Sequence, residues 1–236
     1  MIIWDKVKKY LWPEICPFCG KVYKDGVCPA CRKRVEKLKV EEPRCMKCGK
    51  PVRYHEQEYC HDCIHTRHFF DRGISLWLHK QPVNLSIYQF KYNNQRAFAR
   101  FYATEIVKMH GNVIRRWGAD ALIPIPLHKK RKRKRGYNQS LLLAKELGKI
   151  LQIPVCDKVV KRVRYTDPQK KLDHKMRKAN LAHAFQVKSL PENMKKVILI
   201  DDIYTTGNTI SAVAGELKKF GVEKVYFLTI SIGQGY

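Results

Sequence analysis

The second half of the chain alternates between short apolar segments and longer segments with apolar residues at helical spacing. The apolar segments span residues 119–126, 183–187, 195–202 and 224–230. Between them, residues 138–152 and 210–220 repeat their apolar positions every three or four residues, which predicts two amphipathic helices. Gly221 then predicts the end of the second helix. Strands that alternate with helices predict an α/β fold: a parallel sheet flanked by helices.

The first 70 residues lack this alternation and instead contain eight of the nine cysteines. These eight form four Cys-x-x-Cys pairs: Cys16 and Cys19, Cys28 and Cys31, Cys45 and Cys48, and Cys60 and Cys63. Two such pairs supply the four thiolates of a tetrahedral zinc site. A glycine follows the second cysteine in two pairs, at Gly20 and Gly49, where a tight turn favours positive φ. The spacing predicts a small double zinc ribbon with two structural zinc ions; consecutive pairs are expected to share a metal, and interleaved pairing stays open.

Disulfides or a redox motif are the alternatives for these cysteines. No secretory signal precedes them, so we expect a reducing, cytoplasmic compartment in which disulfides do not persist. The ninth cysteine, Cys156, is expected to be a small core residue. The nearby histidines are expected to be surface residues, because eight thiolates already fill two sites; they are His55, His61, His65 and His68.

The change of pattern predicts two domains, a double zinc ribbon over residues 1–70 and an α/β domain over residues 71–236. The Cys-rich segment has too few apolar residues for a core of its own, so metal binding is expected to be a condition of its folding. With separate domains, removal of zinc would melt only the first 70 residues or so.

The net charge of +26, from 47 Lys and Arg against 21 Asp and Glu, changes the range of expected partners. Such a field attracts polyanions, which favours nucleic acids, phosphorylated small molecules or an anionic membrane surface. No apolar run approaches the roughly 20 residues that a membrane span requires.

The segment VILIDDIYTTGNT, residues 197–209, combines an apolar strand, two carboxylates and a loop of small hydroxyl residues. Ligands of parallel sheets bind at the carboxyl ends of strands, and a loop that enters a helix can hold a phosphate. Two carboxylates beside a phosphate need hydroxyl groups or a cation as partners, which a sugar phosphate supplies. The chain contains no Gly-Lys-Ser/Thr element, so this is not a Walker P-loop.

Residues 197–209 resemble the phosphoribosyl-pyrophosphate signature of type I phosphoribosyltransferases. Residues 123–139 and 166–185 are similar to two further signatures of the ComF family of competence proteins, as is the paired zinc ribbon before them. The resemblance extends from Cys16 to Ile230. It implies a type I phosphoribosyltransferase-like sheet behind the ribbons and a role in bacterial DNA uptake.

The resemblance also implies roles for individual residues. Asp201 and Asp202 would bind the ribose hydroxyls, and the residues after them would bind the 5-phosphate: Thr205, Thr206, Gly207, Asn208 and Thr209. Leu127, His128 and Lys129 fall where the family places its pyrophosphate loop, and Mg²⁺ would bridge pyrophosphate and ribose oxygens. Residues 164–178 fall where the family has a mobile catalytic loop, and the polar residues expected to act in catalysis are Gln169, Arg177 and Asn180. A solvated basic loop is the alternative for this segment.

A dense basic run follows the expected pyrophosphate loop, and we expect it to contact phosphates of nucleic acid or of the leaving pyrophosphate. Contact with water alone is the alternative for this run. The residues predicted to bind nucleic acid are Lys130, Arg131, Lys132, Arg133, Lys134, Arg135 and Tyr137. Tyr137 could stack a base, and packing against the following helix is the alternative.

The expected partners are therefore single-stranded DNA, phosphoribosyl pyrophosphate or a related nucleotide, and the membrane-associated uptake machinery. The competing hypothesis is an active phosphoribosyltransferase with an unknown acceptor, for which the sequence reveals no pocket.

Overall fold

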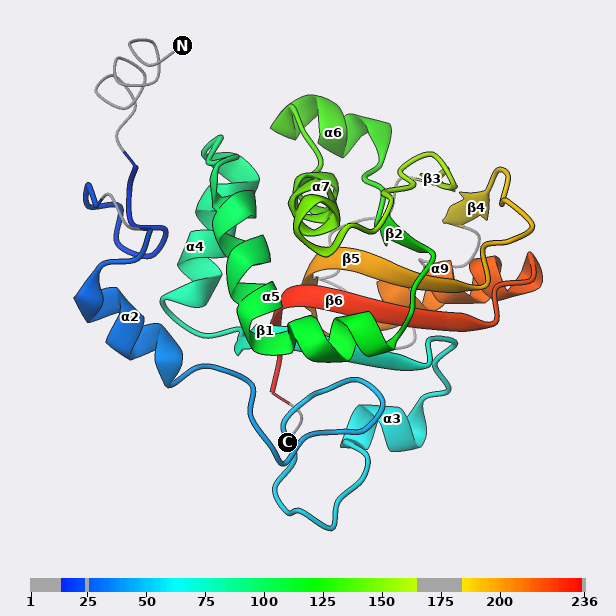
Figure 1. Ribbon diagram of the computed structural model, residues 1–236, viewed down its shortest axis with the longest axis horizontal. Helices are drawn as coiled ribbons and strands as arrows, with labels where there is room; N and C mark the ends of the chain where they lie inside the picture. The colour runs from blue at the N-terminus through cyan, green and yellow to red at the C-terminus, as the bar shows by residue number, and fades with distance from the viewer. Residues whose placement is uncertain (1–13, 24–25, 165–183, 235–236) are drawn as a thin grey trace.

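A four-stranded parallel sheet forms the centre of the computed structural model, which describes residues 14–23, 26–164 and 184–234. The strands follow the order β1-β6-β5-β2 (Figure 1). They comprise β1 (Arg72–Leu78), β2 (Ala121–Pro124), β5 (Lys196–Tyr204) and β6 (Lys224–Ile232). A separate antiparallel pair consists of β3 (Val160–Arg162) and β4 (Phe185–Val187).

Helices cover both faces of the sheet, as strand β5 illustrates through its alternating side chains. Ile198 and Ile200 join one apolar cluster with α4 (Val83–Tyr92), α5 (Phe98–Arg116) and α7 (Gln139–Leu151). Val197 and Leu199 join a second cluster on the other face, with α9 (Asn208–Lys219) and the β3–β4 pair. Because the strand is apolar on both faces, it is buried between two layers, as a parallel strand should be.

The two zinc ribbons pack on opposite faces of this sheet. In the first, which includes α2 (Pro29–Glu36), Cys16, Phe18 and Val35 belong to the same cluster as α5. In the second, which includes α3 (His61–His65), Cys48 and Cys60 belong to the same cluster as α9. Figure 1 shows the first ribbon beside α4 and the second below β1. The cysteine-rich segment therefore shares both apolar cores of the α/β fold, and the boundary at residue 70 stays a prediction.

The predicted fold class is confirmed, and four strands and two helices lie where the sequence pattern places them. Residues 138–152 and 210–220 correspond to α7 and α9, and Gly221 follows α9 with φ +89°. The pattern did not predict β1, α4 or α5, nor that the basic run forms a helix, α6 (Lys129–Arg135). Among the described residues, no helix combines the length and apolar character needed to cross a membrane.

Candidate ligand site and zinc centres

The eight paired cysteines form two compact thiol clusters. Cys16, Cys19, Cys28 and Cys31 form one, Cys45, Cys48, Cys60 and Cys63 form the other, and the sulfurs of each lie within 4.8 Å of one another. The Sγ atoms of Cys19 and Cys28 are 3.8 Å apart, and those of Cys48 and Cys60 are 3.5 Å apart. Tetrahedral zinc–thiolate bonds of about 2.3 Å place sulfurs about 3.8 Å apart. Both donor sets fit zinc, and the expected consecutive pairing is confirmed.

Among the histidines of the ribbons, His68 contradicts the expectation of a surface position. It is 4% exposed and stacks on Phe70 at a centroid distance of 4.9 Å. Burial, aided by the charge of Lys47, lowers the pKa of His68 to about 4. His68 is therefore a neutral core residue under the second ribbon. Cys156, the unpaired cysteine, is half-buried and packs against the apolar cluster to which the second ribbon belongs. It therefore lies at the edge of the core in which it was expected.

The carboxyl edge of the sheet brings together the two loops that the sequence predicts to bind one ligand. Strands β2 and β5 are parallel neighbours, and Pro124 pairs with Ile200. The segment after β2 therefore emerges beside Asp201, the residue that follows Ile200 in β5. Ile125 extends this contact by donating its N–H to the carbonyl of Ile200 at 2.9 Å.

The two aspartates have different partners. Asp202 is buried and forms an ion pair with Lys91 of α4, with 2.8 Å between Nζ and Oδ1. Asp201 accepts hydrogen bonds on Oδ1 from the Ser140 hydroxyl at 3.0 Å and from the N–H of Asp202 at 2.9 Å. Burial and the adjacent charge of Asp202 raise the pKa of Asp201 to about 7. One carboxylate is thus paired with a cation, while the other holds a proton up to neutral pH.

The loop after the aspartates turns sharply into α9. Gly207 precedes the helix with φ +76°, and a Cβ built there would lie 2.4 Å from the Tyr204 hydroxyl oxygen. The Thr206 hydroxyl and the Asn208 amide nitrogen are buried without a hydrogen-bond partner among the described residues. Such groups suit a phosphate, because hydroxyls and amides donate to its oxygens and the positive end of the α9 dipole favours an anion. Thr205 is exposed and Thr209 is half-buried at the same turn.

The expected pyrophosphate loop lies at the same edge and begins the basic helix. Leu127 and His128 are half-buried and Lys129 is exposed. His128 caps α6, since its Nδ1 accepts from the N–H of Lys130 at 3.3 Å. Desolvation, together with the charges of Arg162, Lys130 and neighbouring cations, lowers the pKa of His128.

Three residues of this edge were missed by the sequence analysis: Lys91, Ser140 and Arg162. Arg162 is 9% exposed on β3, and its guanidinium lies 5.2 Å from the centroid of the Phe185 ring. Burial lowers its pKa to about 10, opposed by the charge of Asp201. Of these three residues, only Ser140 could have been inferred from the local sequence, because it closely follows Asn138, the N-cap at the start of α7. Gln169, Arg177 and Asn180 fall between β3 and β4, outside the described residues.

The basic run and Tyr137 have different environments. The seven residues of α6 are exposed or half-buried. Tyr137 is 6% exposed, donates its hydroxyl proton to the Phe90 carbonyl, and has the Arg96 guanidinium 4.8 Å from its ring centroid. Its position favours the packing alternative over base stacking, because the ring faces are covered.

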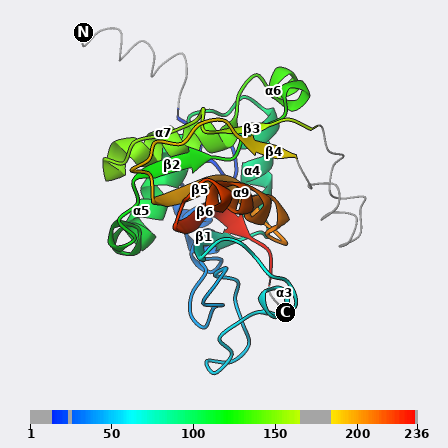
Figure 2. The same ribbon diagram turned by 90° about the vertical axis from the view of Figure 1, so that its right-hand side faces the viewer.

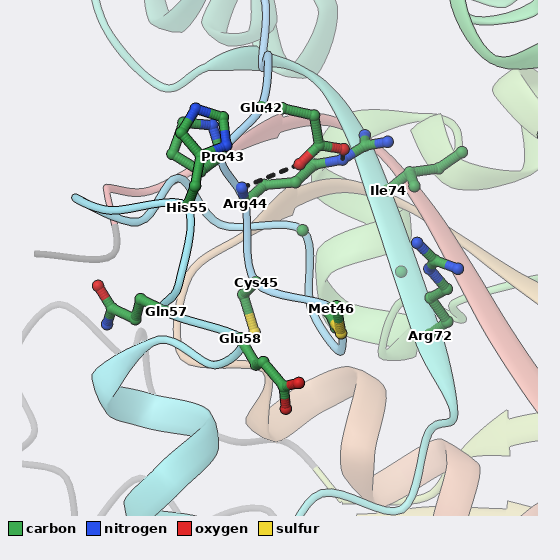
Figure 3. A pocket seen from close by; sticks show the side chains of 12 residues that line it. Glu42, Pro43, Arg44, Cys45, Met46, His55, Gln57, Glu58, Arg72 and Ile74 are labelled. Carbon is green, nitrogen blue, oxygen red and sulfur yellow. Dashed lines mark hydrogen bonds and ion pairs between the residues drawn. The ribbon is translucent and has the colours of Figure 1, made fainter.

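A cavity of about 300 Å³ lies elsewhere, between the second ribbon and the start of β1 (Figure 3). Arg44 crosses it toward Glu42, with 2.7 Å between Nε and Oε1, and Arg72 and Glu58 also line it. Of the predicted site residues, Cys45 alone contributes to this lining. The cavity is therefore separate from the aspartate pair, which lies near the carboxyl end of β5.

Comparisons with known proteins match two separate parts of the chain to family models. Residues 7–64 match the double zinc ribbon domain, and residues 138–231 match the phosphoribosyl transferase domain. The purine phosphoribosyltransferase of Pyrococcus horikoshii Ot3 has a TM-score of 0.36 and 18% identity, over 56% of this chain and 73% of that chain.

Three curated relatives span most of the chain. DNA utilization protein YhgH of Escherichia coli O157:H7 is 27% identical over 85% of this chain and 87% of its own. Competence protein ComFC of Bacillus subtilis is 26% identical over 80% of this chain and 77% of its own. Competence protein F of Haemophilus influenzae is 32% identical over 86% of this chain and 89% of its own. On this similarity, together with a match to a double zinc ribbon followed by a match to a phosphoribosyl transferase domain, the chain belongs to the ComF family of competence proteins.

Proposed function

We propose that this protein binds phosphoribosyl pyrophosphate with Mg²⁺ at the carboxyl edge of its sheet and handles single-stranded DNA on the basic surface beside that site. One observation carries the first part: Asp201 and Asp202 lie near the end of β5, directly before the turn that begins α9. The names of the relatives, which refer to competence and DNA utilization, support the second part.

Each part of the ligand has suitable partners at this edge. The carboxylates of Asp201 and Asp202 accept hydrogen bonds from ribose hydroxyls, while Thr206 and Asn208 donate to the 5-phosphate from their buried polar atoms. The segment from Leu127 to Lys129 would bind the pyrophosphate, with Arg162 as a nearby cation. Mg²⁺ prefers carboxylate and phosphate oxygens, and its charge would stabilise a departing pyrophosphate.

Catalysis of phosphoribosyl transfer is the alternative function. It would require an acceptor, and the residues expected to act in it, Gln169, Arg177 and Asn180, stay predictions. Ligand binding needs none of them, so binding is the function proposed here.

The affinity for phosphoribosyl pyrophosphate with Mg²⁺ is expected to rise roughly tenfold between pH 6 and pH 8. Asp201 must lose its proton to accept hydrogen bonds fully, and with a pKa of about 7 the carboxyl is mostly protonated at pH 6 and mostly ionised at pH 8. Calorimetric titration at the two pH values measures this change. Mg²⁺ pyrophosphate, which lacks the ribose, is the control for protonation of the ligand itself. A folded protein that binds no phosphoribosyl pyrophosphate at either pH would overturn the proposal.

Binding to single-stranded DNA is expected to weaken steeply with salt, because phosphate contacts release counterions. Lys132→Ala with Lys134→Ala removes two exposed charges from α6 and should flatten the slope of log affinity against log salt by about 1.4. Lys195→Ala with Lys196→Ala removes the same number of positive charges at the start of β5, which lies at the opposite edge of the sheet. This variant should leave the slope unchanged. Fluorescence anisotropy with an oligothymidine measures both variants. Equal slopes for the two would show that α6 does not contact the DNA.

The cytoplasm is the proposed compartment. Zinc ribbons depend on eight reduced thiolates, which a reducing compartment maintains.

A further inference from the structure

Helix α4 exposes an apolar stripe on the face opposite to the core. Its buried face comprises Val83, Ser86, Ile87 and Phe90. Leu85, Tyr88 and Tyr92 are 48%, 57% and 49% exposed. Their spacing of three and four residues places them along one side of the helix. Two exposed tyrosines therefore lie side by side, with ring centroids 4.8 Å apart.

The helix that carries these tyrosines is firmly held. The Ser86 hydroxyl hydrogen-bonds the Tyr102 hydroxyl of α5 at 2.6 Å, and the Phe90 and Tyr102 rings are in edge contact at 5.5 Å. Lys91 fixes the same helix to Asp202 of the candidate ligand site. The tyrosines thus project from a rigid base, so little conformational entropy would be lost when a ligand stacks on them.

The stripe continues onto the basic helix through one side chain. The Arg135 guanidinium lies 4.7 Å from the centroid of the Tyr92 ring, and its Nη2 donates to the Tyr92 hydroxyl at 2.8 Å. Figure 2 shows α6 above α4 on the same side of the molecule. Aromatic rings and seven consecutive basic residues therefore form one continuous surface.

The charged side chains of α4 and α6 are of one sign. The sequence contains no Asp or Glu between Asp71 and Glu105, which includes all of α4, or between Asp120 and Glu146, which includes all of α6. Aromatic rings beside a basic track are the arrangement that binds single strands, since bases stack on the rings while Lys and Arg contact the phosphates. In a duplex the base faces are already stacked, so the rings would add little.

We propose that Tyr88 and Tyr92 of α4, extended by Arg135 of α6, form a base-stacking platform for single-stranded DNA. The inference rests on the proposed DNA-handling function and gives it a binding mode that involves base faces as well as phosphates. It also replaces Tyr137, whose ring is covered, as the aromatic partner of the basic run.

The test compares three labelled probes of equal length by fluorescence anisotropy: an oligothymidine, the same backbone with abasic sites, and a duplex. Tyr88→Ala with Tyr92→Ala should weaken binding to oligothymidine by about 10- to 100-fold. Binding to the abasic strand and the duplex should stay within about twofold, because these probes offer no free base faces. The slope of log affinity against log salt should not change, because no charge is removed.

Two control variants separate stacking from other effects. Tyr88→Phe with Tyr92→Phe keeps the rings, although it removes the hydroxyl that Arg135 contacts, and should retain wild-type affinity. Phe220→Ala removes a 51% exposed ring beyond the end of α9 and should also have no effect. Thermal melts verify that each variant is folded.

The test distinguishes failure of the DNA-handling function from failure of the tyrosine platform. If the wild-type protein binds none of the three probes, the DNA-handling function fails and the platform fails with it. If the wild type binds oligothymidine and the double alanine variant binds it equally well, the platform alone is wrong. Equal losses on the oligothymidine and the abasic strand would assign the tyrosines to positioning Arg135 and would overturn base stacking.

Discussion

Removal of zinc is expected to unfold the whole described fold and not the cysteine-rich segment alone. The first ribbon contributes Phe18 to one core, where its ring contacts Trp77 of β1 at 5.6 Å. The second contributes Cys48 and Cys60 to the core on the other face. Structural zinc contributes about 10–16 kcal/mol in zinc-finger peptides, comparable with or larger than the whole stability of a typical domain. Loss of the metal thus removes apolar packing from the cores on both faces of the sheet.

The measurement is thermal unfolding with and without a chelator, followed by far-ultraviolet circular dichroism and by tryptophan fluorescence. Cys48→Ser, which removes one buried ligand of the second cluster, should give the same result without a chelator. Cys156→Ser is the matched control, since this cysteine belongs to neither cluster. If the sheet kept its transition temperature after zinc removal, the ribbons would form an independent domain, as the boundary at residue 70 predicts.

Replacement of both aspartates, Asp201→Asn with Asp202→Asn, is expected to weaken phosphoribosyl-pyrophosphate binding by at least 100-fold. Hydrogen bonds to charged groups contribute about 1.5–3 kcal/mol each, so loss of two carboxylates removes about 3–6 kcal/mol. The substitution also leaves Lys91 without its ion-pair partner at the candidate ligand site. DNA affinity should change by less than about twofold, because the exposed residues of α4 and α6 are untouched.

Asp120→Asn is the matched control for this pair. Asp120 directly precedes β2 at the amino edge of the same sheet, where its Oδ2 accepts from the N–H groups of Lys195 and Lys196 at 2.8 and 2.7 Å. The variant loses the charge that strengthens these hydrogen bonds but should bind the ligand normally. If the double asparagine variant bound phosphoribosyl pyrophosphate as the wild type does, the ligand site would not be at the carboxyl edge of β5. If the variant lost DNA binding as well, the ligand and the DNA would share one site.

The sequence pattern predicts those elements whose side chains repeat with a clear period. Strand β5 is apolar on both faces, and α7 and α9 have apolar residues at helical spacing, so their positions follow from local pattern. Helix α6 could not be predicted this way, because KKRKRKR has no apolar position to reveal a period. Its helical form depends on His128 at the start and on Gly136 at the end, with φ +78°.

The site was predictable where its residues are neighbours in the chain. Asp201, Asp202 and the turn before α9 are contiguous, so one motif indicates them all. Lys91 and Arg162 come from elements far away in sequence, and only the packing of α4 and β3 brings them to the aspartates. Tyr137 illustrates the reverse case. Its proximity to the basic run suggested base stacking, but the Phe90 carbonyl that binds its hydroxyl comes from α4.

The position of β6 determines when the sheet can form during synthesis of the chain. It follows every other described element in the sequence, yet it lies in the middle of the sheet, between β1 and β5. Arg72 pairs with Tyr226, and Phe70 of the second core contacts Phe227 at 4.9 Å. The ribbons emerge from the ribosome first, but their packing surface is incomplete until residues 224–232 have been translated. The nascent ribbons must therefore keep their thiolates reduced, or bind zinc, before the sheet exists to shelter them.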